Sequence, residues 1–278
     1  MKHLLAFLLL PATFWAADAY ADEPIRSANN VEALTLAVSH MSHDQQSRDS
    51  AGDTINNRLT GPQIEFGYAS TRIRDAFGVP GFYSRVEFAL GYGRENFAGA
   101  SLDPSTGAVA PDKGPLDVLT ETARGRFGYE WELGSQKRVA LTPFIGVTQQ
   151  AWRRNSTAAS GTAVYFHDVL EAGLMVQASL SPRLVLGADA SVGHVVGSWQ
   201  IDHGDLIEPR GRIATTGSLY LDHRSDATSH ERLLVRQSSL RFGEPAQSTG
   251  VLEPRRNSGF TIGLEFGTTG NLFEELFH

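Results

Sequence analysis

The 278-residue sequence contains no cysteine, so no disulfide can hold the folded chain together. After Ala21 it also lacks any apolar run of the ~20 residues that a membrane-spanning helix needs. Basic residues are in deficit, with 24 Lys and Arg against 31 Asp and Glu, and no basic cluster suits a nucleic acid. The fold must therefore depend on burial and backbone pairing, and we expect no nucleic-acid partner.

The segment Met1 to Ala21 has the pattern of a secretory signal peptide. Lys2 precedes an apolar run from Leu4 to Trp15, and Ala19-Tyr20-Ala21 provides small residues at a cleavage site. We therefore expect residues 22–278 to form a single exported domain.

Alternation with a period of two organises this domain. In Phe260-Thr261-Ile262-Gly263-Leu264-Glu265-Phe266 every second residue is large and apolar, as in a strand with one apolar face. Stretches 82–92 and 123–133 alternate likewise, but with charged residues opposite the apolar ones, which indicates a hydrated interior. The predicted strands are 31–41, 62–74, 82–95, 117–133, 138–152, 163–180, 184–198 and 258–267.

The connections between these strands alternate between short and long, as the periplasmic turns and external loops of outer-membrane barrels do. We predict an all-β, antiparallel, up-and-down transmembrane β-barrel of eight strands in the cell outer membrane. The stretch 199–257 is expected to be a long external loop. It also contains Ile213 to Leu221 and Leu233 to Phe242, which alternate weakly and would make ten strands if they entered the wall.

Aromatic residues are predicted to form two girdles at the membrane interfaces. Phe82, Phe127, Tyr129, Trp131 and Phe266 are assigned to the periplasmic girdle, and Phe166, Trp152 and Phe260 to the outer one. Pro143 lies inside a predicted strand, where we expect a bulge or an early strand end because proline has no N–H.

Gly259 to Phe266 is similar to the C-terminal strand that the barrel-assembly machinery reads. With the exported N-terminus and the alternating loops, it makes the chain resemble the small outer-membrane barrels typified by outer-membrane protein A. That resemblance implies contact with outer-membrane lipid and lipopolysaccharide, and recognition of Phe260 to Phe266 by the assembly machinery. Unlike those barrels, the chain continues past the final aromatic as a short tail, 267–278.

Charged residues on the inward faces are the candidate site. They are predicted to form a lumen charge network that plugs the barrel, because unpaired buried charges cost several kcal/mol; a cation path is the alternative. The residues are Glu65, Arg85, Glu87, Arg124, Arg126, Glu130, Glu132, Glu171, Asp189 and Glu265.

Enzymatic and metal signatures are weak. His40, Ser42 and His43 lie close in sequence, and Asp202-His203 and Asp222-His223 are adjacent pairs. No spacing resembles the signature of an outer-membrane lipid deacylase or phospholipase, and no aspartate pair resembles that of the outer-membrane aspartyl-type proteases. His40 and His43 would point to opposite faces of a strand. We therefore assign no catalytic, cofactor or metal residues.

The predicted function is that of a surface barrel acting through its external loops in adhesion, envelope integrity or partner binding. Loops 42–61, 96–116 and 199–257 are the expected contact regions for a host or matrix ligand. The alternatives are a narrow cation-preferring channel and a membrane-embedded hydrolase.

Overall fold

The computed structural model describes residues 23–48, 53–76, 79–102, 109–155, 163–202, 205–207, 211–243, 253–270 and 272. Its elements in chain order are α1 (Pro24–Ala28), β1 (Glu32–Arg48), β2 (Thr54–Ala76), β3 (Val79–Leu102), β4 (Val109–Tyr129), β5 (Trp131–Leu133), β6 (Val139–Arg154), β7 (Ala163–Ser181), β8 (Leu184–Asp202), β9 (Asp205–Ile207), β10 (Gly211–Arg224), β11 (Ser229–Phe242) and β12 (Glu253–Thr268). The expected signal peptide, 1–21, and all of the tail beyond 270 except Leu272 lie outside the described residues.

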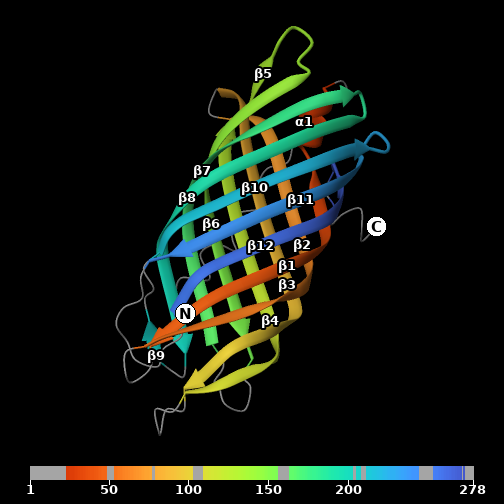
Figure 1. Cartoon of the computed structure of the whole chain (residues 1–278). Coiled ribbons are helices and arrows are strands. Elements are labelled where there is room, and N and C mark those ends of the chain that lie inside the picture. The colour runs from red at the N-terminus through yellow and green to blue at the C-terminus, as the bar shows by residue number, and fades with distance from the viewer. Residues whose placement is uncertain are drawn as a thin grey trace.

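Ten antiparallel strands form a closed barrel (Figure 1). The wall closes because β1 pairs with β12, and β10 pairs with both β8 and β11. Two short strands stand outside this count: β5 extends the pairing of β4 with β6, and β9 pairs with β8. Within the described residues, no helix is long and apolar enough to cross a membrane.

The prediction of eight strands is wrong, and the ten-strand alternative matches. The missing pair is β10 and β11, which lie within the stretch 199–257 that was expected to be an external loop. Their outward faces include Thr215 and Gln237, so their apolar signal is weaker than that of β12. Cross-strand pairing with β8 and β12 holds them in the wall nonetheless.

The outer face of the barrel is apolar and the inner face is polar. Ile145 and Phe66 point outward and are 67% and 64% exposed, whereas Arg126 points inward and is 4% exposed. A water-soluble protein would reverse this arrangement, so the outward band faces lipid. Together with the closed barrel, this band places the chain in the outer membrane.

Most of the predicted girdle aromatics do point outward. Trp152 is the exception, because it faces the lumen and is only 1% exposed. On the outer wall, Phe166 instead meets Trp199 with ring centroids 6.3 Å apart.

Pro143 interrupts a neighbouring strand rather than its own. β6 continues through Pro143 without a register shift, but its partner breaks into β4 and β5 at Glu130. The missing N–H of proline explains this gap in the ladder. On the opposite side of the strand, Glu130 N–H continues the ladder with β3 by donating to the Gly81 carbonyl at 2.9 Å.

The strands continue well beyond the lipid-facing band at the end opposite the short turns, which we take as extracellular. β3 has 24 residues, roughly 75 Å at about 3.3 Å per residue, about twice what a tilted strand needs to cross a bilayer. Most of the expected loops 42–61 and 96–116 is therefore strand.

The β3–β4 hairpin rises farthest from the wall on one side. β4 pairs with β6 only from Val118 toward the periplasmic end. In the described chain, the extracellular part of β4 therefore has β3 as its one neighbour. The carbonyl of Asp117 accepts a hydrogen bond from the Asn155 N–H, on the side of β4 that faces away from β3. Every second residue before Asp117 directs its backbone N–H and carbonyl to that same side, which is the unpaired edge of the hairpin. Two of those positions are Pro111 and Pro115, which have no N–H to donate, and Lys113 between them is exposed.

Candidate functional site: a filled lumen

The periplasmic end of the lumen contains α1 (Figure 1). Pro24 lies in its first turn, where a missing N–H costs nothing. Ile25 and Ala28 are almost fully buried and pack on Ala140 and Val185 from the surrounding wall. The helix thus presents an apolar face to the barrel and fills its periplasmic mouth.

Hydrogen bonds tie this plug to several strands. The Asn29 amide donates to Glu130 Oε2 at 2.9 Å and to Gln177 Oε1 at 2.7 Å. Arg232 donates to the carbonyl of Ala28 at 2.8 Å. These contacts fix α1 to β7, β11 and the residue between β4 and β5.

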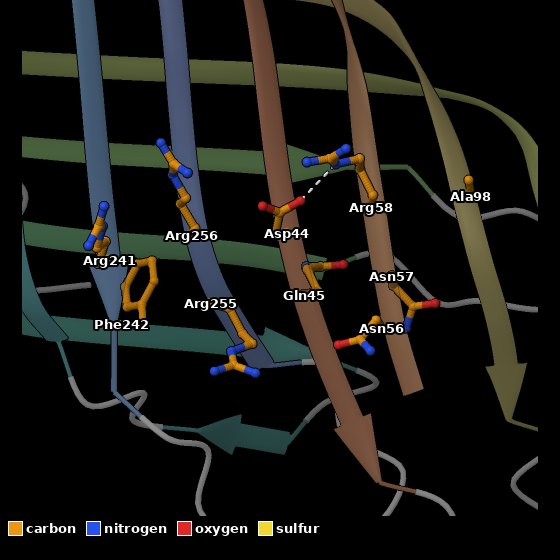
Figure 2. Close-up of a pocket in the computed structure, with 10 residues that line it drawn as sticks. All are labelled: Asp44, Gln45, Asn56, Asn57, Arg58, Ala98, Arg241, Phe242, Arg255 and Arg256. Atoms are coloured by element: carbon orange, nitrogen blue, oxygen red, sulfur yellow. Dashed lines mark hydrogen bonds and ion pairs between the residues drawn. The ribbon is translucent and has the colours of Figure 1, made fainter. Parts of the chain in front are cut away.

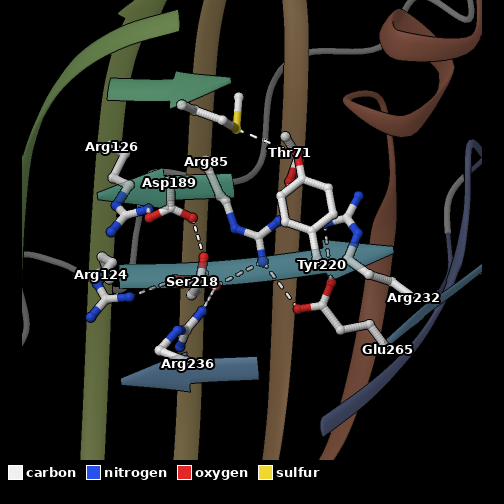
Figure 3. A network of polar contacts seen from close by, with 12 residues as sticks. Thr71, Arg85, Arg124, Arg126, Asp189, Ser218, Tyr220, Arg232, Arg236 and Glu265 are labelled. Carbon is white, nitrogen blue, oxygen red and sulfur yellow. Dashed lines mark hydrogen bonds and ion pairs between the residues drawn. The ribbon is translucent and has the colours of Figure 1, made fainter. Parts of the chain in front are cut away.

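Next to α1, on the side toward the extracellular end, arginines and carboxylates form a continuous chain of ion pairs (Figure 3). Arg232 lies 3.0 Å from Asp222 and 3.2 Å from Glu265. Glu265 also pairs with Arg85 at 3.1 Å, and Arg85 pairs with Glu87 at 2.7 Å.

Glu87 is the branch point of the chain. Besides Arg85, it contacts Arg236 at 2.8 Å and Arg124 at 3.3 Å. Three guanidinium groups therefore surround one buried carboxylate, which explains why this carboxylate needs no partner from the solvent.

The branch continues toward β7 and β8. Arg126 lies 3.1 Å from Glu171 and 3.0 Å from Asp189, and Arg124 lies 3.7 Å from Glu171. The hydroxyl of Ser218 donates to the second oxygen of Asp189. Both lumen carboxylates are thereby held by more than one donor.

The charges in this network balance. Five arginines face five carboxylates, and none of these side chains is more than 23% exposed. The members are Arg85, Arg124, Arg126, Arg232, Arg236, Glu87, Glu171, Asp189, Asp222 and Glu265. Full pairing is the condition under which charges are tolerated in a dry interior.

Seven of the ten residues expected from the sequence lie in this network. Glu130 and Glu132 lie nearer the periplasmic end, where Arg26 of α1 comes within 3.9 Å and 3.3 Å of them, respectively. Glu65 faces the lumen higher up and has no ion pair among the described residues.

Three charged members of the network were missed because they lie on β10 and β11. The signal was present in the sequence: Arg232 and Arg236 alternate with the apolar Leu233 and Val235. Asp222 likewise follows the outward-facing Leu221. Each segment shows the period-two pattern, but over too few large apolar residues to stand out.

An aromatic layer fills the lumen above the charges. The Trp152 ring stacks on Tyr165 at 3.8 Å and on His43 at 4.2 Å. Gln45 donates to the Tyr165 hydroxyl at 2.7 Å. Apolar side chains pack around this stack, namely Leu59, Phe97, Leu116, Val118 and Ala163.

A carboxylic acid is buried at the same level. Glu95 is 0% exposed, and its Oε1 accepts a hydrogen bond from Gln63 at 2.6 Å. His43 Nε2 lies 3.8 Å from that oxygen, beyond hydrogen-bond distance. Thr120 completes the cluster by donating to Gln63 at 2.9 Å.

The structure does not bring the suggested hydrolase residues together. His43 is buried in the lumen and His40 lies on the outer wall, while His203 lies outside the described residues. Another pair, His167 and Ser198, is 2.9 Å apart, but it is buried with Phe242 packed against the imidazole at 4.7 Å. No cluster of three potential metal ligands occurs among the described residues.

A hollow of about 620 Å³ lies at the extracellular end, where β11, β12, β1, β2 and β3 run side by side (Figure 2). The side of the hollow nearer the membrane is a line of charged residues on the outer wall. The lining residues are Asp44, Gln45, Asn56, Asn57, Arg58, Ala98, Arg241, Phe242, Arg255 and Arg256.

Comparison with known proteins supports the fold. No family model and no curated protein matches the chain. The outer membrane protease OmpT from Escherichia coli is similar in structure, with a TM-score of 0.52, 9% identity, and coverage of 86% of this chain and 96% of that one. The transport unit of the autotransporter AIDA-I from Escherichia coli gives a TM-score of 0.39 at 9% identity, covering 84% of this chain and 90% of its own. The chain therefore has the fold of a small outer-membrane β-barrel.

Proposed function

We propose that the protein is a non-conducting outer-membrane barrel that binds partners at its extracellular end. The observation that supports this function is the filling of the lumen at three successive levels. These are the α1 plug, the balanced arginine–carboxylate network and the stack of Trp152, Tyr165 and His43. A ten-stranded barrel filled in this way has no open path through its lumen, so we assign its function to its outer surface.

The β3–β4 hairpin is the binding element that we propose. It carries strand structure beyond the barrel wall to Leu102 and resumes at Val109, so it presents a firm surface rather than a long loose loop. Its edge is poor in N–H donors, which favours recognition through side chains over the addition of a partner strand.

Trimming the hairpin tests this proposal. Residues 98–113 would be replaced by Asn-Gly, which joins the paired residues Phe97 and Gly114 with a tight turn. Cells displaying the trimmed protein should lose binding to immobilised matrix glycoproteins and epithelial cells. They should keep a heat-modifiable band when boiled and unboiled samples are compared on a gel.

The matched control shortens the connection between β1 and β2, residues 49–53, and should leave binding intact. Unchanged binding after hairpin trimming would overturn the assignment of this element. Equal loss in both variants would show that binding belongs to the whole rim.

Planar-bilayer recording tests the closed lumen separately. The folded protein should give no steady conductance. A conductance that Glu171→Gln or Asp189→Asn alters would instead make the network a cation path, the alternative that the sequence left open.

We also propose that the assembly machinery reads β12. The outward positions from Phe260 to Phe266 are large and apolar and lie in the strand that closes the barrel against β1. Replacing Phe266 with Ser should lower the amount of heat-modifiable protein in cells, while Phe82→Ser, at another outward aromatic, should lower it less.

A further inference from the structure

A line of charged side chains crosses four neighbouring strands on the outer wall. Arg241 of β11 is paired in register with Arg256 of β12. Arg256 is in turn paired with Asp44 of β1 on its other side, and Asp44 is paired with Arg58 of β2. The four share outward parity with the lipid-facing residues below them, and Figure 2 shows them side by side.

The line has an uncompensated positive end. Arg58 pairs with Asp44 at 2.8 Å, which uses the one acidic group in the line. Arg241 and Arg256 lie directly opposite each other, and the described part of the chain gives neither guanidinium an ion pair or a hydrogen bond. Like charges in facing positions of adjacent strands repel, so this placement favours an anion that bridges them.

The height of the line indicates which anion. On this side of the barrel the lipid-facing band ends at Val38, Ile64 and Phe260, which are all about half exposed. Arg256 is four residues beyond Phe260, about 13 Å along the strand and roughly 10 Å along the axis of a tilted barrel. That height corresponds to the headgroups of the outer leaflet.

The wall between the band and the arginines suits a headgroup. Its outward residues include Ser42, Thr60, Ser239 and Ser258, which are small, polar and half-buried, beside His40 and Gln237. No bulky side chain separates the arginines from the lipid surface at these positions.

We propose that Arg241 and Arg256 bind the phosphate groups of lipopolysaccharide in the outer leaflet. Each guanidinium offers a planar pair of donors that matches phosphate oxygens, and two adjacent guanidinium groups match a doubly charged group. This positive patch is not evident from the sequence, because the net charge is −7 and the two arginines become neighbours only through the register of β11 with β12. The site is independent of partner binding by the β3–β4 hairpin.

Binding of fluorescent lipid A to detergent-folded protein tests the proposal. The wild type should bind lipid A with its phosphates at least fivefold more tightly than lipid A from which they have been removed. The R241Q/R256Q variant should lose most of that difference. The R94Q/R153Q variant, which removes two exposed arginines from β3 and β6, should keep it.

Three results would overturn the proposal. The first is equal affinity of the wild type for both forms of lipid A, and the second is an equal loss in the control variant, which would show a general charge effect. The third is thermal stabilisation by millimolar inorganic phosphate without lipid, which would show a soluble-anion site. A heat-modifiable band confirms that each variant is folded before binding is measured.

Discussion

Arg126 of β4 and Asp189 of β8 meet at 3.0 Å inside the barrel, although β6 and β7 separate their strands in the wall. The pair therefore crosses part of the lumen rather than joining neighbours in the sheet. It connects two strands that are three positions apart in the wall through a buried ion pair, and loss of this pair would leave a carboxylate without its cation.

We expect Arg126→Ala to lower the free energy of unfolding by about 3–5 kcal/mol, because Glu171 and Asp189 would lose their shared partner while still buried. Urea unfolding of protein folded into lipid vesicles measures this change. The exposed Arg153→Gln should shift stability by less than about 0.5 kcal/mol. An unchanged unfolding transition for Arg126→Ala would mean that the network does not stabilise the barrel.

Asn29→Ala should destabilise the protein by roughly 1–3 kcal/mol, because it leaves Glu130 and Gln177 without the amide that bonds both of them. Release of α1 should also speed proteolysis near the N-terminus of the folded barrel. The exposed Asn96→Ala on the outer wall is the control. Protease resistance equal to that of the wild type would contradict the role of Asn29 in fixing the plug.

Trp152→Ala should cost about 3–5 kcal/mol, because a large ring is removed from between Tyr165 and His43. Trp199→Ala removes the same side chain from the outer wall, where lipid can fill the space, and should cost less. Chemical denaturation of both variants in the same vesicles compares them. A larger effect at Trp199 would contradict the lumen position of the aromatic layer.

The turn between β10 and β11 should show a pH dependence of its own. Bonds from the backbone N–H groups of Thr228 and Ser229, both 2.8 Å, lower the pKa of Asp226 to about 2. A lowered carboxyl pKa contributes stability that is present above the unfolded value near ~4 and is lost as the pH falls toward the folded value.

Asp226→Asn removes that titration, so the stability difference between wild type and variant should shrink from pH 5 to pH 2. Thermal unfolding followed by circular dichroism at several pH values measures it. A difference that stays constant over this range would show that the charge of Asp226 does not hold the turn.

The sequence predicted the barrel architecture because alternation is a local property. Each strand must place lipid-facing and lumen-facing side chains in turn, so Arg85 and Glu87 of β3 or Phe260 and Ile262 of β12 reveal their faces without knowledge of the partner strand. The same reasoning failed for β10 and β11. There Thr215 and Gln237 weaken the outward signal, and pairing with β8 and β12 compensates for it.

The arrangement within the lumen depends on the closed fold. Glu87 contacts three arginines because of the register between the strands of the wall, and α1 contacts Ala140 and Val185 because the barrel is closed around it. Sequence spacing alone specifies neither contact. The position of Trp152, in contrast, could have been predicted, because β6 has no register shift and Trp152 lies an odd number of residues from the outward-facing Val139 and Ile145. Alternation therefore places it in the lumen, although the expected girdle placed it outside.

The open edge of the β3–β4 hairpin has a consequence for crowding in the membrane. Unpaired strand edges on neighbouring copies tend to form hydrogen bonds with each other and so to join the copies into continuous sheets across the cell surface. Pro111 and Pro115 interrupt any such ladder, and the charge of Lys113 repels its counterpart on another copy. The protein is thus suited to dense display, with each hairpin remaining a separate, accessible unit.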